Sequence, residues 1–166
     1  MVRIQGGRTT HDHDGEIAVF LIGVRVNRLH RVDQWLPVFL AMPRMLTELY
    51  RAKATAASGG GEDLGFLEAR TLIGGKGVTT VQYWRSTADI YAYAASTSHA
   101  HRSAWTAFNT RARRAADAVG IWHETYAVPA GGHESVYVGM PLTGLASATT
   151  SVPIEGSRRK HAALTP

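Results

Sequence analysis

The chain of 166 residues contains no cysteine. This absence excludes disulfide bonds, catalysis by a thiolate, and zinc or iron–sulfur centres held by cysteine side chains. A chain that makes no disulfide suits a reducing compartment, so we expect a cytoplasmic location.

A long hydrophobic run is also missing. Near the N-terminus the longest apolar run is Ala18 to Val24, far shorter than the roughly 20 residues that a membrane-spanning helix needs. The first fifteen residues are polar and rich in glycine, unlike a signal peptide or an anchor. We therefore expect no interaction with a membrane.

Several familiar motifs are absent as well. The sequence has no HExxH, GxSxG or GxGxxG motif, and its three adjacent glycines, 59 to 61, lack the spaced Lys and Ser or Thr of a phosphate-binding loop. The net charge of +5 is scattered along the chain. Because no recognised binding motif accompanies that charge, we expect no nucleic-acid partner.

What the chain does contain is enough apolar sequence for one folded domain, with 45% hydrophobic residues. Apolar patterns and turn signals predict strands at 16–26, 64–73, 78–85 and 121–128, with helical regions at 35–50 and 86–119. The order β-α-β-β-α-β is that of the ferredoxin-like fold, an α+β fold with a four-stranded antiparallel sheet and helices on one face.

The first predicted strand, Glu16 to Val26, is apolar almost throughout, so both of its faces need cover. Helices on one face leave the other open, and we infer that a second subunit covers it in a homodimer. Residues 1–14 are expected to be a disordered segment and residues 15–140 the folded domain. Residues 141–166 are expected to be an arm over the neighbouring subunit or a disordered tail.

Proline and capping residues divide the helical regions. Pro37 fits a first helical turn, whereas Pro43 should kink or split the first helix. That bend could open a cavity, or it could simply mark a pause between two short helices. Ser86 is a candidate N-cap of the second helical region, and Asp89 occupies the acidic position of a capping box.

Two histidines lie at the start of the next predicted helix. His101, Trp105 and Phe108 follow one another at steps of four and three, so they share one apolar helical face. His99 is rotated by about 200° from His101 and lies on the polar side. His101 therefore points toward the space between helix and sheet, where it could be a helix-end histidine bonded to a carbonyl, a general base or a haem ligand.

Further polar candidates lie on the last two predicted strands. His123 and Glu124 are adjacent and must point to opposite faces, and we expect one of them to be buried. Arg85 ends the preceding strand, as a solvated ion-pair partner or as a clamp for an anion. The aromatic residues of the chain are expected to be mostly core, and those selected as the wall of a substrate pocket are Phe39, Tyr83, Trp84, Tyr93, Trp105 and Phe108.

Several phrases resemble one known family. They are AVFLIGVRVNRLHRVDQWLPVFLAMPRMLTELY, LGFLEARTLI, VQYWRSTADIYAYAASTSHAHRSAWTAFN, VGIWHETYAV and ESVYVGMPLTGL. In this order they are similar to a bacterial and fungal family of dimeric α+β barrel proteins, called monooxygenase-like after a fungal member from the fumagillin cluster. The resemblance covers about residues 15–145 and implies a cavity between the sheet and the helices of each subunit.

The wider superfamily implied by this resemblance contains cofactor-independent oxygenases and haem enzymes. The preferred expectation is an oxygenase without metal or flavin, which acts as a homodimer with O₂ on a hydrophobic small molecule of secondary metabolism. His101 would be the base, and Arg85 or His123 its electrostatic partner. The resemblance also permits a haem enzyme of the peroxidase or aldoxime dehydratase kind, with His101 or His99 on the iron. A third reading is a protein that binds an apolar ligand without catalysis.

Overall fold

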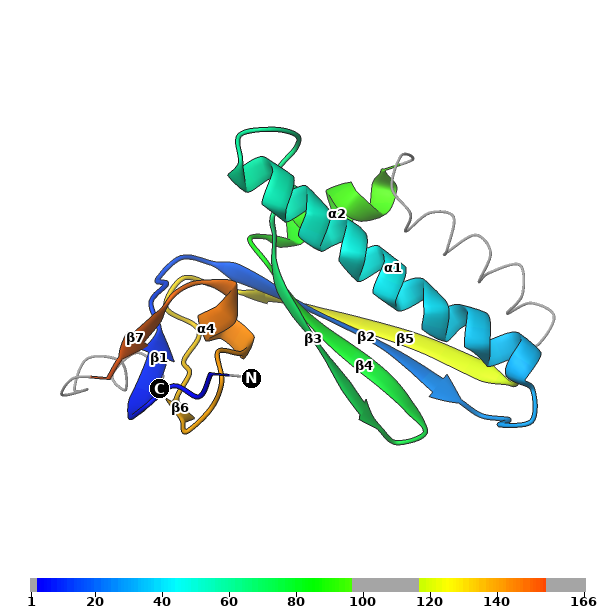
Figure 1. The fold of residues 1–166 in the computed structure, drawn as a ribbon. Coiled ribbons are helices and arrows are strands. Elements are labelled where there is room, and N and C mark those ends of the chain that lie inside the picture. Colours follow the sequence, from blue (N-terminus) through cyan, green and yellow to red (C-terminus); the bar gives the residue numbers. More distant parts are fainter. Residues whose placement is uncertain (1–2, 97–116, 155–166) are drawn as a thin grey trace.

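The computed structural model describes residues 3–96 and 117–154. Its main sheet has four antiparallel strands in the order β3-β4-β2-β5. The four strands and the two helices between them are, in chain order, β2 (Ile17–Val26), α1 (Val32–Ala57), β3 (Phe66–Gly74), β4 (Gly77–Trp84), α2 (Thr87–Ala95) and β5 (Val119–Val128). Figure 1 shows α1 lying across one face of this sheet. The predicted ferredoxin-like α+β architecture is confirmed.

The β3–β4 hairpin turns at Gly75 and Lys76, which both have positive φ angles, +57° and +67°. Two successive left-handed residues form the type of tight turn whose twist matches that of the flanking strands. The glycine-rich turn expected between the second and third predicted strands is therefore a two-residue hairpin loop.

Helix α1 is continuous, so the expected break at Pro43 is wrong. Pro37 and Pro43 both lie inside the helix. The buried residues Val38, Met42, Met45 and Leu49 follow steps of four, three and four, and this stripe begins next to Pro37 and continues past Pro43. The hydroxyl of Thr47 donates a 2.8 Å hydrogen bond to the carbonyl of Pro43. We attribute the continuity to the stripe, because its burial outweighs the loss of one backbone hydrogen bond at each proline.

Helix α2 begins as its sequence predicts. Ser86 is the N-cap, and its Oγ accepts a hydrogen bond from the Asp89 backbone N–H at 3.2 Å. Buried residues from this helix, α1 and the sheet form the core between the layers: Ala18, Leu49, Phe66, Trp84, Ile90 and Tyr93.

A second, smaller sheet joins the two ends of the chain. Its order is β6-β1-β7, with β1 (Arg8–His11), β6 (Tyr137–Val138) and β7 (Ser151–Pro153). The expected disorder of residues 1–14 is therefore wrong for β1, in which Thr9, Thr10 and His11 are buried. Strand β1 is ordered because it pairs with a strand on each side. Its polar sequence alone does not indicate these partners, because they lie far away in the chain.

The short helix α4 (Gly144–Ala148) covers part of the sheet face opposite α1. Its residues Leu145 and Ala148 form a cluster with Ile17, Val81 and Tyr83. Residues 141–153, expected as part of an arm or a disordered tail, thus return to their own chain through α4 and β7. A bulge between Phe66 and Glu68 interrupts the β3–β4 register at this place.

Beyond α4, the same sheet face is open in the single chain. The strand alternation places Val19, Leu21 and Gly23 on this side, and Val19 and Leu21 pack against the α4 cluster. Trp122 and Tyr126 of β5 share the face and are 39% and 50% exposed. A Cβ added at Gly23 would meet the indole of Trp122 at 2.3 Å, so the ring lies directly over this glycine.

In the described ranges, no helix is long and apolar enough to cross a membrane.

Candidate functional site

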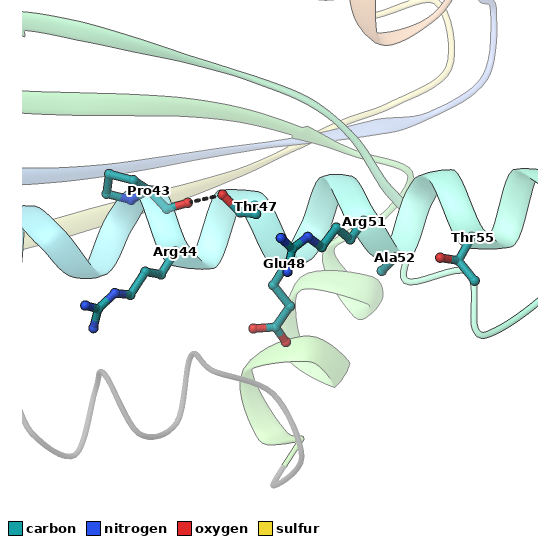
Figure 2. Close-up of a pocket in the computed structure, with 7 residues that line it drawn as sticks. All are labelled: Pro43, Arg44, Thr47, Glu48, Arg51, Ala52 and Thr55. Carbon is teal, nitrogen blue, oxygen red and sulfur yellow. Dashed lines mark hydrogen bonds between the residues drawn. The ribbon is translucent and has the colours of Figure 1, made fainter.

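A pocket of about 750 Å³ lies along one side of α1. Its lining residues follow the helix in alternating steps of one and three and come from a single helical face: Pro43, Arg44, Thr47, Glu48, Arg51, Ala52 and Thr55. Figure 2 shows Arg44 and Glu48 extending from α1 on the side away from the strands, with Glu48 beside α2. The pocket therefore begins at Pro43, where the sequence suggested a cavity, although the helix does not bend there.

A charged residue of the pocket on α1 affects the pKa of a tyrosine on α2. Tyr93 of α2 is buried, and burial is the main reason that its pKa is raised far above the ordinary value. The negative charge of Glu48 raises the pKa of Tyr93 further. The phenol therefore stays protonated and can act only as a neutral hydrogen-bonding group near the pocket.

Two cationic side chains lie in the same wall. Arg44 and Arg51 are seven residues apart, about two helical turns, so both belong to the pocket face of α1. Within residues 3–96 and 117–154, neither arginine forms an ion pair. Their aliphatic stems, with Pro43 and Ala52, give the wall apolar surface beside its charges. The wall thus combines apolar surface with two arginines and the carboxylate of Glu48.

The predicted aromatic wall is divided by the sheet. Trp84 and Tyr93 lie together on the α1 side, with ring centroids 5.7 Å apart. Trp84 is only 1% exposed, and its indole N–H donates to Gln82 at 2.9 Å. Tyr83 faces the opposite side and packs with Leu145 of α4. The structure therefore brings Trp84 and Tyr93 together and separates Tyr83 from them.

Phe39 and His123 lie farther along the α1 side of the sheet. Phe39 packs edge-on against Trp35 at 5.4 Å, beside a cluster that includes Val24 and Val119. His123 of β5 shares the face of Val119 by strand alternation, and its ring centroid is 5.7 Å from that of Phe20. His123 and Glu124 are both exposed in the single chain, so the expectation that one is buried is not met here.

Arg85 forms ion pairs at the surface. Its guanidinium is 2.7 Å from Asp63 and 3.2 Å from Asp89, and its side chain is 54% exposed. The hydrogen bonds to Asp89 and Asp63 raise the pKa of Arg85. For Asp63, the Gly65 backbone N–H is the main cause of a lowered pKa, and Arg85 is the next. The arginine thereby links the loop before β3 to the start of α2.

The remaining predicted site residues, His99, His101, Trp105 and Phe108, lie outside the described residues. Among the described residues, no group of three or more His, Asp and Glu side chains is arranged to hold a metal ion.

Sequence reasoning missed the polar residues of this region. Thr80 and Gln82 alternate with Val81 on β4 and are buried on the α1 side of the sheet. The hydroxyl oxygens of Thr80 and Thr71 are 3.2 Å apart. Arg44, Glu48 and Arg51 had no predicted role. Their positions on one helical face next to Pro43 could have indicated a common site. The neighbour of this face, α2, is known only from the structure.

Comparison with solved structures supports the fold. The aldoxime dehydratase OxdRE in complex with butyraldoxime aligns with a TM-score of 0.61 and 15% identity, over 90% of this chain and 42% of that one. A second aldoxime dehydratase structure gives 0.61 and 16%, over 90% and 43%. The chain thus spans less than half the length of these two proteins, and identities this low establish shared architecture alone.

Comparison with known sequences gives the family. No curated protein matches the chain. A model of one protein family, however, matches residues 17–145, a range that runs from the start of β2 into α4 and contains the whole four-stranded sheet. The chain therefore belongs to the Monooxygenase af470-like family.

Proposed function

We propose that this enzyme is a cofactor-independent oxygenase that acts on a hydrophobic small molecule with an acidic phenol or ketone group. The observation that carries the proposal is the family match over residues 17–145. The pocket along α1 supports it, because about 750 Å³ falls within the range of small-molecule sites. A substrate from secondary metabolism and a cytoplasmic location are parts of the same proposal.

The chemistry needs a base and a place for negative charge. His101, on the apolar face of its predicted helix, removes a proton from an acidic ring CH₂ group and leaves a carbanion. The carbanion reacts with O₂: one oxygen atom becomes a carbonyl oxygen, the other leaves as water, and the carbon loses both hydrogens. The substrate supplies all the electrons, so the step balances without a metal or flavin.

The charges of the pocket suggest how the anion is held. Arg44 and Arg51 lie in the wall without ion pairs to other described residues, whereas Arg85 is already held by Asp63 and Asp89. We therefore assign anion stabilisation to the two pocket arginines instead of Arg85. His123 lies on the same side of the sheet as Phe20, and its predicted role as an electrostatic partner of the base stays part of the proposal.

The working form in this proposal is a homodimer. Trp122 and Tyr126 leave a partly exposed aromatic surface on the sheet face that α4 does not cover. A large apolar patch on an otherwise soluble chain is typical of an interface. A second copy, with the same patch, can cover it by two-fold symmetry.

The experiment is O₂ uptake by metal-free and haem-free protein with a panel of polycyclic phenols and anthrones. The proposal predicts consumption of O₂ with formation of the quinone, lowered by a factor of about 10² or more in His101→Ala. His99→Ala is the matched control and should keep the rate. Tight binding of these compounds without O₂ uptake would instead identify a ligand-binding protein.

A second candidate is a haem-dependent dehydratase, suggested by the fold shared with the aldoxime dehydratases. In this reading His101 or His99 would hold the haem iron, and the iron would bind and polarise the aldoxime. Haem-loaded protein would then convert butyraldoxime to its nitrile, and His101→Ala or His99→Ala would lose both this turnover and the haem absorbance.

A further inference from the structure

A hydrogen-bonded line of one serine and two histidines lies outside the four-stranded sheet. His11 is the last residue of β1, and His133 and Ser135 precede β6. Ser135 Oγ is 2.7 Å from Nδ1 of His11, and Nε2 of His11 is 2.7 Å from Nδ1 of His133. Nε2 of His133 lies 2.8 Å from the carbonyl oxygen of Gly15. Figure 1 shows the small sheet beyond one end of the main sheet.

The carbonyl oxygen of Gly15, at the end of the line, determines which atom donates in each hydrogen bond. A carbonyl oxygen only accepts, so Nε2 of His133 carries a proton and, in a neutral ring, its Nδ1 accepts. Nε2 of His11 must then donate to His133, which leaves Nδ1 of His11 as an acceptor. The hydroxyl of Ser135 donates to that nitrogen. The order is nucleophile, base and orienting group, the arrangement that activates a serine.

Burial distinguishes the base from the nucleophile. His11 is 1% exposed and pairs with Ser151 of β7, whereas Ser135 and His133 are partly exposed. The backbone N–H of His11 also donates to Ser135 Oγ, at 3.2 Å. The ring of His13 stacks on that of His133 at 5.8 Å, with 21° between the planes. A shielded base with its ring fixed at both nitrogens thus holds the hydroxyl of a residue that is itself partly exposed.

We propose that Ser135 is the nucleophile of an acyl-transfer site, with His11 as general base and His133 as a positioning residue, and that the site takes small activated esters such as aryl acetates. The site is separate from the pocket on α1 and does not depend on the oxygenase proposal.

The reaction balances as an ester hydrolysis. The Ser135 oxygen forms a bond to the acyl carbon while its proton moves to Nδ1 of His11. The bond from the acyl carbon to the aryl oxygen breaks, and His11 returns the proton to the leaving phenol. Water then attacks the acyl-serine, with His11 again taking and returning a proton, and releases the acid and free Ser135.

The test uses the full-length protein with p-nitrophenyl acetate. Release of nitrophenolate is followed by absorbance, and peptide mass spectrometry locates the acetyl group on protein quenched early. The expected result is an acetyl group on Ser135. Ser135→Ala should lower the rate by a factor of about 10² or more, whereas the control Ser151→Ala, at the β7 position paired with His11, should keep it.

His133 is tested as a positioning residue. His133→Phe should lower kcat and leave KM close to the wild-type value, because the substrate contacts Ser135 and not His133. The proposal is overturned if the acetyl group lies on other side chains, or if folded Ser135→Ala hydrolyses the ester at the wild-type rate. Since the adduct is measured on the wild-type protein, it decides the matter even if a variant fails to fold.

Discussion

Tyr50 ties α1 to the edge strand β3 at the level of single side chains. Its hydroxyl donates to Glu68 and lies 3.1 Å from the carbonyl and from the N–H of Ala69. Ser147 of α4 donates to the other oxygen of Glu68 at 2.9 Å. Glu68 follows the β3 bulge and therefore joins elements from both faces of the sheet, α1 through Tyr50 and α4 through Ser147.

This arrangement predicts a loss of stability at high pH. Burial, followed by the hydrogen bond to Glu68, raises the pKa of Tyr50 from 10.0 to about 12. The folded state therefore holds the phenolic proton more tightly than the unfolded chain. The resulting stabilisation is complete below the unfolded pKa of 10.0 and is lost as the pH rises toward about 12.

Thermal unfolding between these two pH values measures the effect. The melting temperature of Tyr50→Phe should fall less steeply with pH than that of the wild type, while Tyr91→Phe, a matched change at an exposed α2 residue, should keep the wild-type slope. Equal slopes for all three proteins would show that Tyr50 is not responsible.

The positions of residues could be predicted where local pattern decides them. The neighbours Trp84 and Tyr93 could be placed near one another from strand and helix order, but the side of Tyr83 could not, because adjacent strand residues alternate and only packing chooses the face. The role of Arg85 depends on Asp63, twenty-two residues earlier in the chain. His11, His133 and Ser135 could not be joined, because more than 120 residues separate β1 from its partners.

At the scale of elements, the start of α2 depends on one side chain. Ser86 accepts the Asp89 N–H at 3.2 Å, and its own hydroxyl donates to the Asp89 carboxylate at 2.7 Å. The first of these bonds satisfies one of the backbone N–H groups that the first turn of this nine-residue helix leaves without an intrahelical partner. Such a short helix has little intrinsic stability and relies on its cap and its packing.

Ser86→Ala should therefore lower the free energy of unfolding by about 1 kcal/mol. Ser86→Thr keeps a hydroxyl at the same place and should recover most of that loss. Denaturant unfolding of the three proteins measures the difference. If Ser86→Ala were as stable as the wild type, the cap would contribute nothing to the folded state.

The same scale shows why the ends of the chain were misjudged. The four strands and α2 have local signals, namely apolar runs, a glycine turn and a capping box, and these predicted the fold. Strand β1 has a polar sequence, RTTH, and is buried only because β6 and β7 lie beside it. Pro43 is a local signal for a break, yet the buried stripe from Val38 to Leu49 keeps α1 continuous.

At the scale of the whole molecule, one face of the main sheet is only partly covered in a single chain. The core between α1 and the sheet is closed by buried residues, and α4 closes one end of the opposite face. Trp122, lying over Gly23, and Tyr126 mark the part that remains exposed. Our account assigns this surface to a second copy of the chain.

Sedimentation equilibrium tests the dimer. The wild type should have twice the mass of one chain, and Trp122→Lys should shift the population to monomer, because a buried charge at an apolar interface is costly. Tyr91→Lys makes a similar change on exposed α2 and should stay dimeric. A monomeric wild type would refute the dimer, and an unaffected Trp122→Lys dimer would place its interface elsewhere.

The central claim is that this family member carries out its oxidation without a cofactor. A visible absorbance spectrum of the purified protein, before and after addition of haem, tests it most directly. Our account predicts no Soret band in the purified protein and no shift of the added haem spectrum. A haem band that shifts on binding, is lost in His101→Ala and persists in His99→Ala would contradict the claim and make His101 an iron ligand.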